Sequence, residues 1–268
     1  MIGIVKIWDF KSYISKFLIE RLLRVKKSEN TMTIQKYYEN LFSNSATQFT
    51  TLIADTDALK EFIKAHNLSA DFDLILSTIE DRPESKLLAY ASREYKVALY
   101  SCAAANYRLA YSSLRLVFEM ALASVYFSAY EIKLRKWLIS AEDIVWAPII
   151  DKENGIFANQ FIKPFNSNLE TIGKQYGVIA ETAYRECSEY VHGNYHTQPD
   201  ITDKIVFNAD TSKKWNDLCD SIFMTFLFAF TARYIMFLSQ QNRDKIEKIL
   251  IERLGHLEVV QDIYGKGA

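Results

Sequence analysis

The chain has 268 residues, a net charge of −1 and 49% hydrophobic residues. A chain of this length can bury a sizeable core. Its charge creates no global field that would attract nucleic acid or a membrane, so any contact with nucleic acid needs a local patch. The chain contains 8 glycines and 4 prolines. Strand-rich folds use many of both in their turns, so this scarcity favours long helices joined by few loops.

The cysteines also exclude some classes of protein. The chain has three, Cys102, Cys187 and Cys219, and no two of them form a CxxC pair. This pattern predicts reduced thiols and neither a disulfide framework nor a zinc ribbon. The first residues lack the apolar region and cleavage site of a signal peptide, and we expect a cytoplasmic protein.

The N-terminal part is predicted to be a helical extension that covers residues 1–80. Residues 7–27 carry apolar side chains at helical spacing, with Lys and Arg on the other face. Such a basic amphipathic helix packs as a terminal helix, lies on a membrane surface or docks to a partner. Two further helices are predicted at 34–42 and 47–66, followed by a break at 67–73.

The remainder, residues 81–268, is predicted to form a multi-helix bundle. Arg82, Pro83 and Glu84 give a helix-start signal, because Pro suits the first turn and Glu suits its positive end. No Gly or Pro interrupts residues 84–138, so this window holds one long helix or two with a turn between them. Further helices are expected at 157–176, 178–192, 211–240 and 243–254, with Gly177 and Gly193 ending the first two of these.

The most apolar stretch, residues 222–238, is interrupted by Arg233 and is too short to span a bilayer. We interpret it as a buried core helix. A membrane-associated effector is the alternative that this stretch leaves open.

One helix, ending at His192, combines an apolar stripe with a polar one. The apolar stripe consists of Ala180, Tyr184, Cys187 and Val191, and the polar stripe consists of Arg185, Ser188, Glu189 and His192. Arg185 and His192 lie two turns apart, roughly 10 Å along the axis. Two long side chains at this spacing can converge on one group between them, such as a phosphate.

These residue types suit the cleavage of RNA. Arg binds phosphate through a planar fork, and His exchanges protons near neutral pH. The RNA 2′-hydroxyl supplies the nucleophile, so no metal or cofactor is needed. Glu186 or Glu189 could orient the imidazole or the guanidinium. A purely structural interpretation is an Arg185–Glu189 ion pair and a His192 that is stabilised by the helix dipole.

The spacing of Arg185 and His192, with six residues between them, resembles the R-x4–6-H signature of the HEPN superfamily. The segment YRECSEYVHG and the preceding run at 111–127 also resemble helices of bacterial helical proteins. The resemblance implies an all-helical core and a homodimeric, metal-independent ribonuclease in which Arg and His of both subunits meet in a cleft. It further implies a role in antiphage, stress or toxin–antitoxin systems, with RNA as substrate. Glu186 departs from the Asn, Asp or His that often follows the Arg in active members.

A second polar feature lies inside the apolar segment LRLVFEMAL, residues 114–122. Arg115 and Glu119 have i,i+4 spacing, and a charged pair there must be compensated. It either forms a buried salt bridge that fixes the helix register or supports Arg185 and His192. His192 and His196 have a spacing that binds zinc on a helix, but Gly193 and Asn194 lie between them and we predict no metal site.

The alternative function is a non-catalytic helical interaction or scaffold subunit of a defence complex. In that case the helices at 7–27 and 243–254 would be the docking surfaces.

Overall fold

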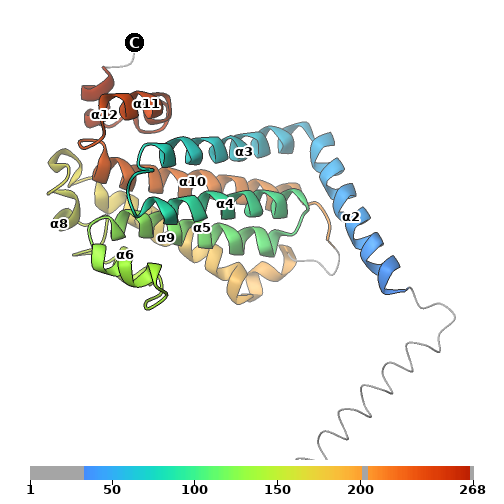
Figure 1. Ribbon diagram of the computed structural model, residues 1–268. Coiled ribbons are helices and arrows are strands. Elements are labelled where there is room, and N and C mark those ends of the chain that lie inside the picture. The colour runs from blue at the N-terminus through green and yellow to red at the C-terminus, as the bar shows by residue number, and fades with distance from the viewer. Residues whose placement is uncertain (1–32, 201–204, 266–268) are drawn as a thin grey trace, which may run out of the picture. The chain divides into compact units, whose positions relative to one another are not determined.

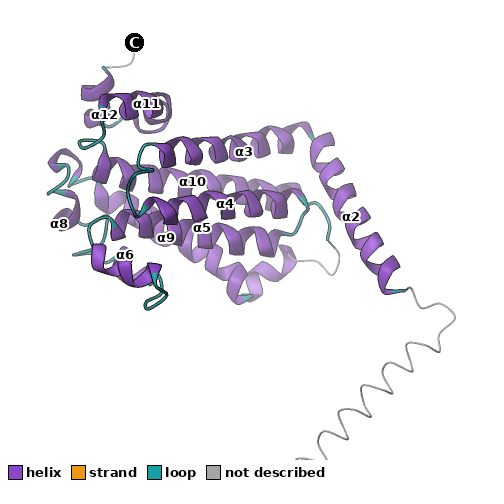
Figure 2. Ribbon diagram, viewed as in Figure 1, coloured by secondary structure: helices purple, strands orange, loops and turns teal. Residues whose placement is uncertain are grey.

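The structure, a computed structural model, describes residues 33–200 and 205–265. The predicted helix at 7–27 lies outside the described residues. The described residues form helices and turns without a strand (Figure 2), which confirms the all-α prediction. The elements are α2 (Ile34–Ala54), α3 (Thr56–Ser77), α4 (Ser85–Ala103), α5 (Tyr107–Phe127), α6 (Glu131–Leu138), α7 (Trp146–Ile149), α8 (Asn159–Ile162), η1 (Ser167–Leu169), α9 (Gly173–His192), η2 (Tyr195–Asp200), α10 (Ala209–Tyr234), α11 (Gln240–Leu254) and α12 (Glu258–Tyr264).

The chain divides into two compact units, residues 1–45 and 46–268, and the division falls within α2. In the second unit, α3, α4, α5, α9 and α10 run side by side (Figure 1). Helices α5 and α10 are buried around most of their circumference, as expected for helices that others surround. The predicted multi-helix bundle is therefore present.

The second unit includes α3, which the sequence analysis assigned to the N-terminal extension. Leu68, Phe72 and Ile75 of α3 are fully buried, and the Phe72 ring packs against Phe223 and Phe226 of α10 at centroid distances of 5.0 and 5.3 Å. This packing also explains why the break predicted at 67–73 is wrong. An apolar stripe at i, i+4 and i+7 keeps the helix continuous against its neighbours.

The break lies earlier, at Asp55 between α2 and α3. Its side chain accepts hydrogen bonds from the backbone amides of Asp57 and Ala58 at 3.1 and 3.0 Å. Asp is a favoured N-cap because its carboxylate satisfies amides that have no partner within the helix. The two helices predicted at 34–42 and 47–66 are thus replaced by α2 and α3.

Gly177 does not end a helix as predicted, and it shares its role with Gly173, for which no role was predicted. The single helix expected at 157–176 is replaced by α8, η1 and turns, and α9 begins at Gly173 and continues through Gly177. A Cβ on Gly173 would lie 2.4 Å from the backbone oxygen of Phe157, and one on Gly177 would lie 3.3 Å from its Cβ. These glycines therefore permit close packing of α9 against the Phe157 segment and do not end a helix.

The apolar stretch predicted at 222–238 is a buried core helix as far as Tyr234, where α10 ends, whereas Met236 and Phe237 beyond it are exposed. Arg233 within it is buried, and its Nε donates to Ser128 Oγ at 2.8 Å while its guanidinium lies over the Phe165 ring at 4.1 Å. The cation is thereby compensated inside the core. None of the described helices has the length and apolar character needed to cross a membrane.

Candidate functional site

Helix α9 carries the candidate residues and packs between α5 and α10 (Figure 1). Its buried face contains Ala180, Ala183, Cys187 and Tyr190. The predicted apolar stripe was wrong at its end, because Val191 is exposed and Tyr190 is buried in its place. The Tyr190 ring stacks on Tyr111 of α5 with a centroid distance of 3.6 Å, and this contact selects which side of the last turn faces inward.

The end of α9 at His192 is set by Gly193, as predicted. Gly193 has φ 65° and ψ 39°, the left-handed conformation that favours glycine. The Gly193 amide donates to Tyr190 O at 3.4 Å and the Asn194 amide donates to Glu189 O at 3.0 Å. These two bonds form a Schellman motif, which holds His192 at a defined place on the last turn.

The polar stripe of α9 faces solvent. The Arg185 side chain is 84% exposed, and its Nε lies 3.7 Å from Glu189 Oε1. An exposed pair at this distance contributes little to stability and can open to a ligand. His192 is also exposed. The hydroxyl of Ser188 donates to the backbone oxygen of Tyr184 at 2.7 Å, so its proton is used within its own helix.

Glu186 lies on another side of α9 and is half-buried. Burial raises the pKa of its carboxyl above 4.5, the neighbouring Glu189 raises it further, and Lys214 and Asp217 act in opposite directions. Lys214 and Asp217 belong to α10, so Glu186 lies within electrostatic reach of that helix as well as of Glu189 on its own helix. Of the two predicted glutamates, Glu189 is the one that pairs with Arg185.

The i,i+4 ion pair of Arg115 and Glu119 is present, with Nε to Oε1 at 3.2 Å. Both residues also bond Tyr184 of α9. Its hydroxyl donates to Glu119 Oε1 at 3.0 Å and accepts from Arg115 Nη2. Trp146 stacks on the Tyr184 ring at 3.9 Å. This network fixes Tyr184, the residue before Arg185, and in this way links α5 to the helix that carries the candidate site.

The tertiary structure adds residues that the sequence analysis missed. Helices α5 and α9 run antiparallel, so the start of α5 lies at the end of α9. A Cβ on Gly193 would lie 3.5 Å from Nη2 of Arg108, the second residue of α5. Tyr195, 86% exposed, follows the turn with its ring 6.1 Å from that of His196. Neither Arg108 nor Tyr195 belongs to a recognisable motif, and only the packing of two distant helices reveals their position.

The histidine pair does not lie on one helix, because His192 ends α9 and His196 belongs to η2. Across the described ranges, no three His, Cys, Asp or Glu side chains are grouped so that they could hold a metal ion. No protein-family model, curated protein or solved structure matches the sequence.

Proposed function

We propose that the chain is a metal-independent endoribonuclease of the HEPN type that acts in a bacterial antiphage or stress response. The observation that supports this proposal most is the solvent-exposed end of α9, where Arg185 and His192 share one face and Arg108 approaches from α5. Three basic side chains near one helix end provide the local patch that a chain with a net charge of −1 needs to bind RNA.

In the proposed reaction, Arg185 binds the scissile phosphate and stabilises the charge that develops on it. The RNA 2′-oxygen attacks phosphorus and the bond to the 5′-oxygen breaks, which leaves a 2′,3′-cyclic phosphate and a 5′-hydroxyl. His192 of one subunit accepts the proton of the 2′-hydroxyl, and the protonated His192 of the other subunit gives a proton to the leaving 5′-oxygen. Each chain supplies one Arg185–His192 set, and a homodimer would supply the second.

The exposed surroundings of His192 suit this role. Arg108 and Arg185 are also exposed and can turn toward a phosphate without a change in the backbone. Tyr195 presents its ring to solvent, and aromatic rings of this kind stack on unpaired bases. These features favour a single-stranded substrate.

The proposal is tested with the full chain and a short fluorescent single-stranded RNA. We expect cleavage that persists in EDTA, is absent with 2′-O-methyl RNA, and falls at least about 100-fold in His192→Ala. His66→Ala is the matched control because His66 is an exposed histidine on α3. Unchanged cleavage in His192→Ala would refute the proposal.

A second comparison isolates the arginine. Arg185 and Arg135 are both exposed and both form i,i+4 ion pairs with a glutamate. We expect Arg185→Ala to lose cleavage and Arg135→Ala to retain it. Equal losses would show that the effect is one of net charge and not of a site.

The second candidate function is a non-catalytic interaction subunit. It is favoured by the large apolar side chains that α2 exposes, among them Ile34, Phe42 and Ile53. In this case a change of Phe42 to Ser would alter the assembly state, measured by light scattering, and RNA would remain intact with every variant of Arg185 and His192.

A further inference from the structure

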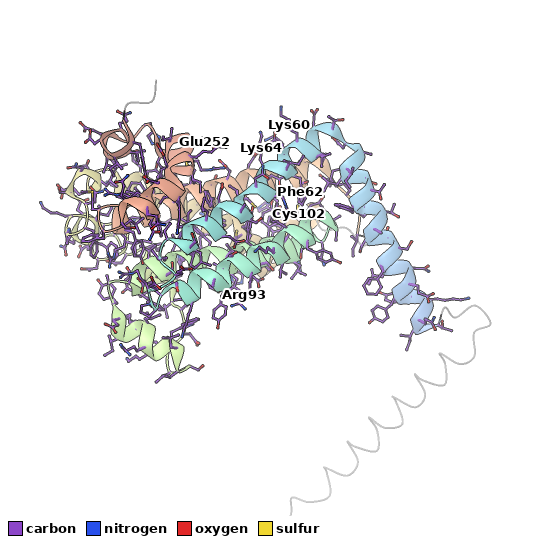
Figure 3. All side chains as sticks on the ribbon, turned by 45° about the horizontal axis from the view of Figure 1, so that its top comes forward. Lys60, Phe62, Lys64, Arg93, Cys102 and Glu252 are labelled. Carbon is purple, nitrogen blue, oxygen red and sulfur yellow. The ribbon has the colours of Figure 1, made fainter. Side chains whose placement is uncertain are left out.

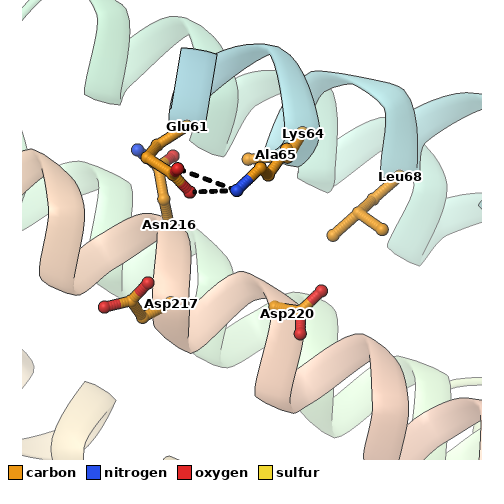
Figure 4. Close-up of a pocket in the computed structure, with 7 residues that line it drawn as sticks. All are labelled: Glu61, Lys64, Ala65, Leu68, Asn216, Asp217 and Asp220. Atoms are coloured by element: carbon orange, nitrogen blue, oxygen red, sulfur yellow. Dashed lines mark hydrogen bonds and ion pairs between the residues drawn. The ribbon is translucent and has the colours of Figure 1, made fainter. Parts of the chain in front are cut away.

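A cavity of about 300 Å³ lies between α3 and α10. Figure 4 shows its polar walls. Glu61 and Lys64 come from α3, and Asn216, Asp217 and Asp220 come from α10. The volume lies at the small end of the range for ligand sites, roughly 300–1,000 Å³.

Asn216 is the unusual member of this cavity. The residue is 5% exposed, and neither its Oδ1 nor its Nδ2 has a hydrogen-bond partner within the described part of the chain. Its side chain reaches from α10 toward Glu61 of α3 (Figure 4). A buried carboxamide without partners is costly and calls for an explanation. A ligand that offers both a donor and an acceptor would satisfy both of its atoms.

The α3 wall carries one anion and one cation. Lys64 Nζ donates to both carboxylate oxygens of Glu61, at 2.7 and 2.9 Å. The Lys64 side chain is 62% exposed, so its ammonium can leave Glu61 without losing contact with water. Figure 3 shows Lys60 and Lys64 projecting from α3, on the side of the bundle opposite to Arg93 of α4. When this pair opens, it presents an anion and a cation next to the carboxamide.

The α10 wall adds negative charge. Asp217 pairs with Lys213 at 2.6 Å, and Asp220 pairs with Arg253 at 2.6 Å. Both aspartates are well exposed in these pairs, so their bonds are weak and exchangeable. Each already binds a lysine or an arginine of this chain. A ligand with a basic side chain would replace those partners with chemically equivalent groups.

We propose that this cavity binds a free basic α-amino acid, such as arginine or lysine. Both Asn216 atoms are closed to solvent in the structure, so the Glu61–Lys64 pair opens first. The ligand ammonium then bonds Glu61 and Asn216 Oδ1, and the ligand carboxylate bonds Lys64 and Asn216 Nδ2. The basic side chain extends toward Asp217 and Asp220. A zwitterion leaves the Glu61–Lys64 charges balanced, whereas a simple anion would face three carboxylates.

The apolar part of the cavity fits this occupant. Ala65 and Leu68 of α3 complete its lining, and both are buried in the core. They offer contact to the methylene groups that arginine and lysine carry between their charged ends. The site is independent of the proposed ribonuclease activity.

The test is calorimetric titration of the full chain with L-arginine and L-lysine. We expect saturable binding with one site per chain, and affinity at least tenfold lower for agmatine, which lacks the carboxylate, and for L-glutamate. Asn216→Leu removes both unpartnered atoms with little change in volume. This variant should unfold at the same or a higher temperature and lose binding at least tenfold.

Asp220→Asn separates the side-chain preference from the rest of the site. It should reduce binding of L-arginine while Asp262→Asn, an exposed control on α12, leaves it unchanged. The proposal is overturned if L-arginine does not bind, if Asn216→Leu binds it as tightly as the unchanged chain, or if agmatine matches L-arginine.

Discussion

Removal of one hydroxyl from the network between α5 and α9 should have a defined cost. In Tyr184→Phe, Glu119 loses the hydrogen bond that it accepts at 3.0 Å, and Arg115 loses an acceptor. Hydrogen bonds to charged groups contribute roughly 1.5–3 kcal/mol each. The side chains of Arg115 and Glu119 are 20% and 21% exposed, and their own bond at 3.2 Å remains. Water and the residual ion pair therefore offset part of the loss, and we expect a destabilisation of about 2 kcal/mol.

Urea denaturation followed by circular dichroism measures this change. The midpoint should fall while the m-value stays constant, because the ring remains stacked on Trp146. Tyr100→Phe is the control, because the Tyr100 side chain is exposed on α4, and it should change stability by less than about 0.5 kcal/mol.

A double-mutant cycle with Glu119→Gln tests the physical reason. If the hydroxyl acts through Glu119, the two substitutions should be non-additive by about 1 kcal/mol. Additive effects, or a loss in Tyr184→Phe no larger than that in the control, would refute the reasoning. If the network also positions Arg185, cleavage of RNA should fall in Tyr184→Phe under conditions where the protein is fully folded.

Three further predictions concern the same region and the core. Burial raises the folded-state pKa of Glu186 above 4.5, so its charge opposes folding increasingly as pH rises through that raised value. Glu186→Gln should therefore add at most about 1 kcal/mol to the free energy of unfolding at pH 7 and nothing at pH 4. An equal gain at both pH values would contradict this sign. Gly193→Ala places a Cβ at φ 65° and should cost about 1 kcal/mol, measured by thermal unfolding. An unchanged unfolding temperature would contradict the αL strain. Burial raises the pKa of all three thiols, that of Cys102 to about 12 and those of Cys187 and Cys219 as well. They should react with a thiol reagent only as fast as the chain unfolds. Rapid labelling of the folded protein would contradict this prediction.

The sequence alone determined the helical class of this protein. Scarce Gly and Pro and an apolar run around Arg233 were sufficient, because helix formation and burial follow from local composition and period. The end of α9 at His192 was also predictable, since Gly193 is a local signal for the left-handed conformation. The i,i+4 pair of Arg115 and Glu119 was also predictable, because residues four apart are neighbours on the surface of a helix.

Prediction from the sequence was wrong where contacts between distant segments determine the local structure. It placed a break at 67–73 that the packing of Phe72 against α10 prevents. Gly177 was predicted to end a helix, although its lack of a side chain instead permits the close approach of Phe157. In both cases a local signal was overridden by a contact that joins segments far apart in the chain.

The same distinction applies to function. Arg185 and His192 were readable as a pair because one helix carries both. The approach of Arg108 to Gly193, and the cavity in which Glu61 and Asn216 meet, required the tertiary structure. Helical periodicity fixes which residues share a face of one helix, but only packing fixes which faces of two helices meet.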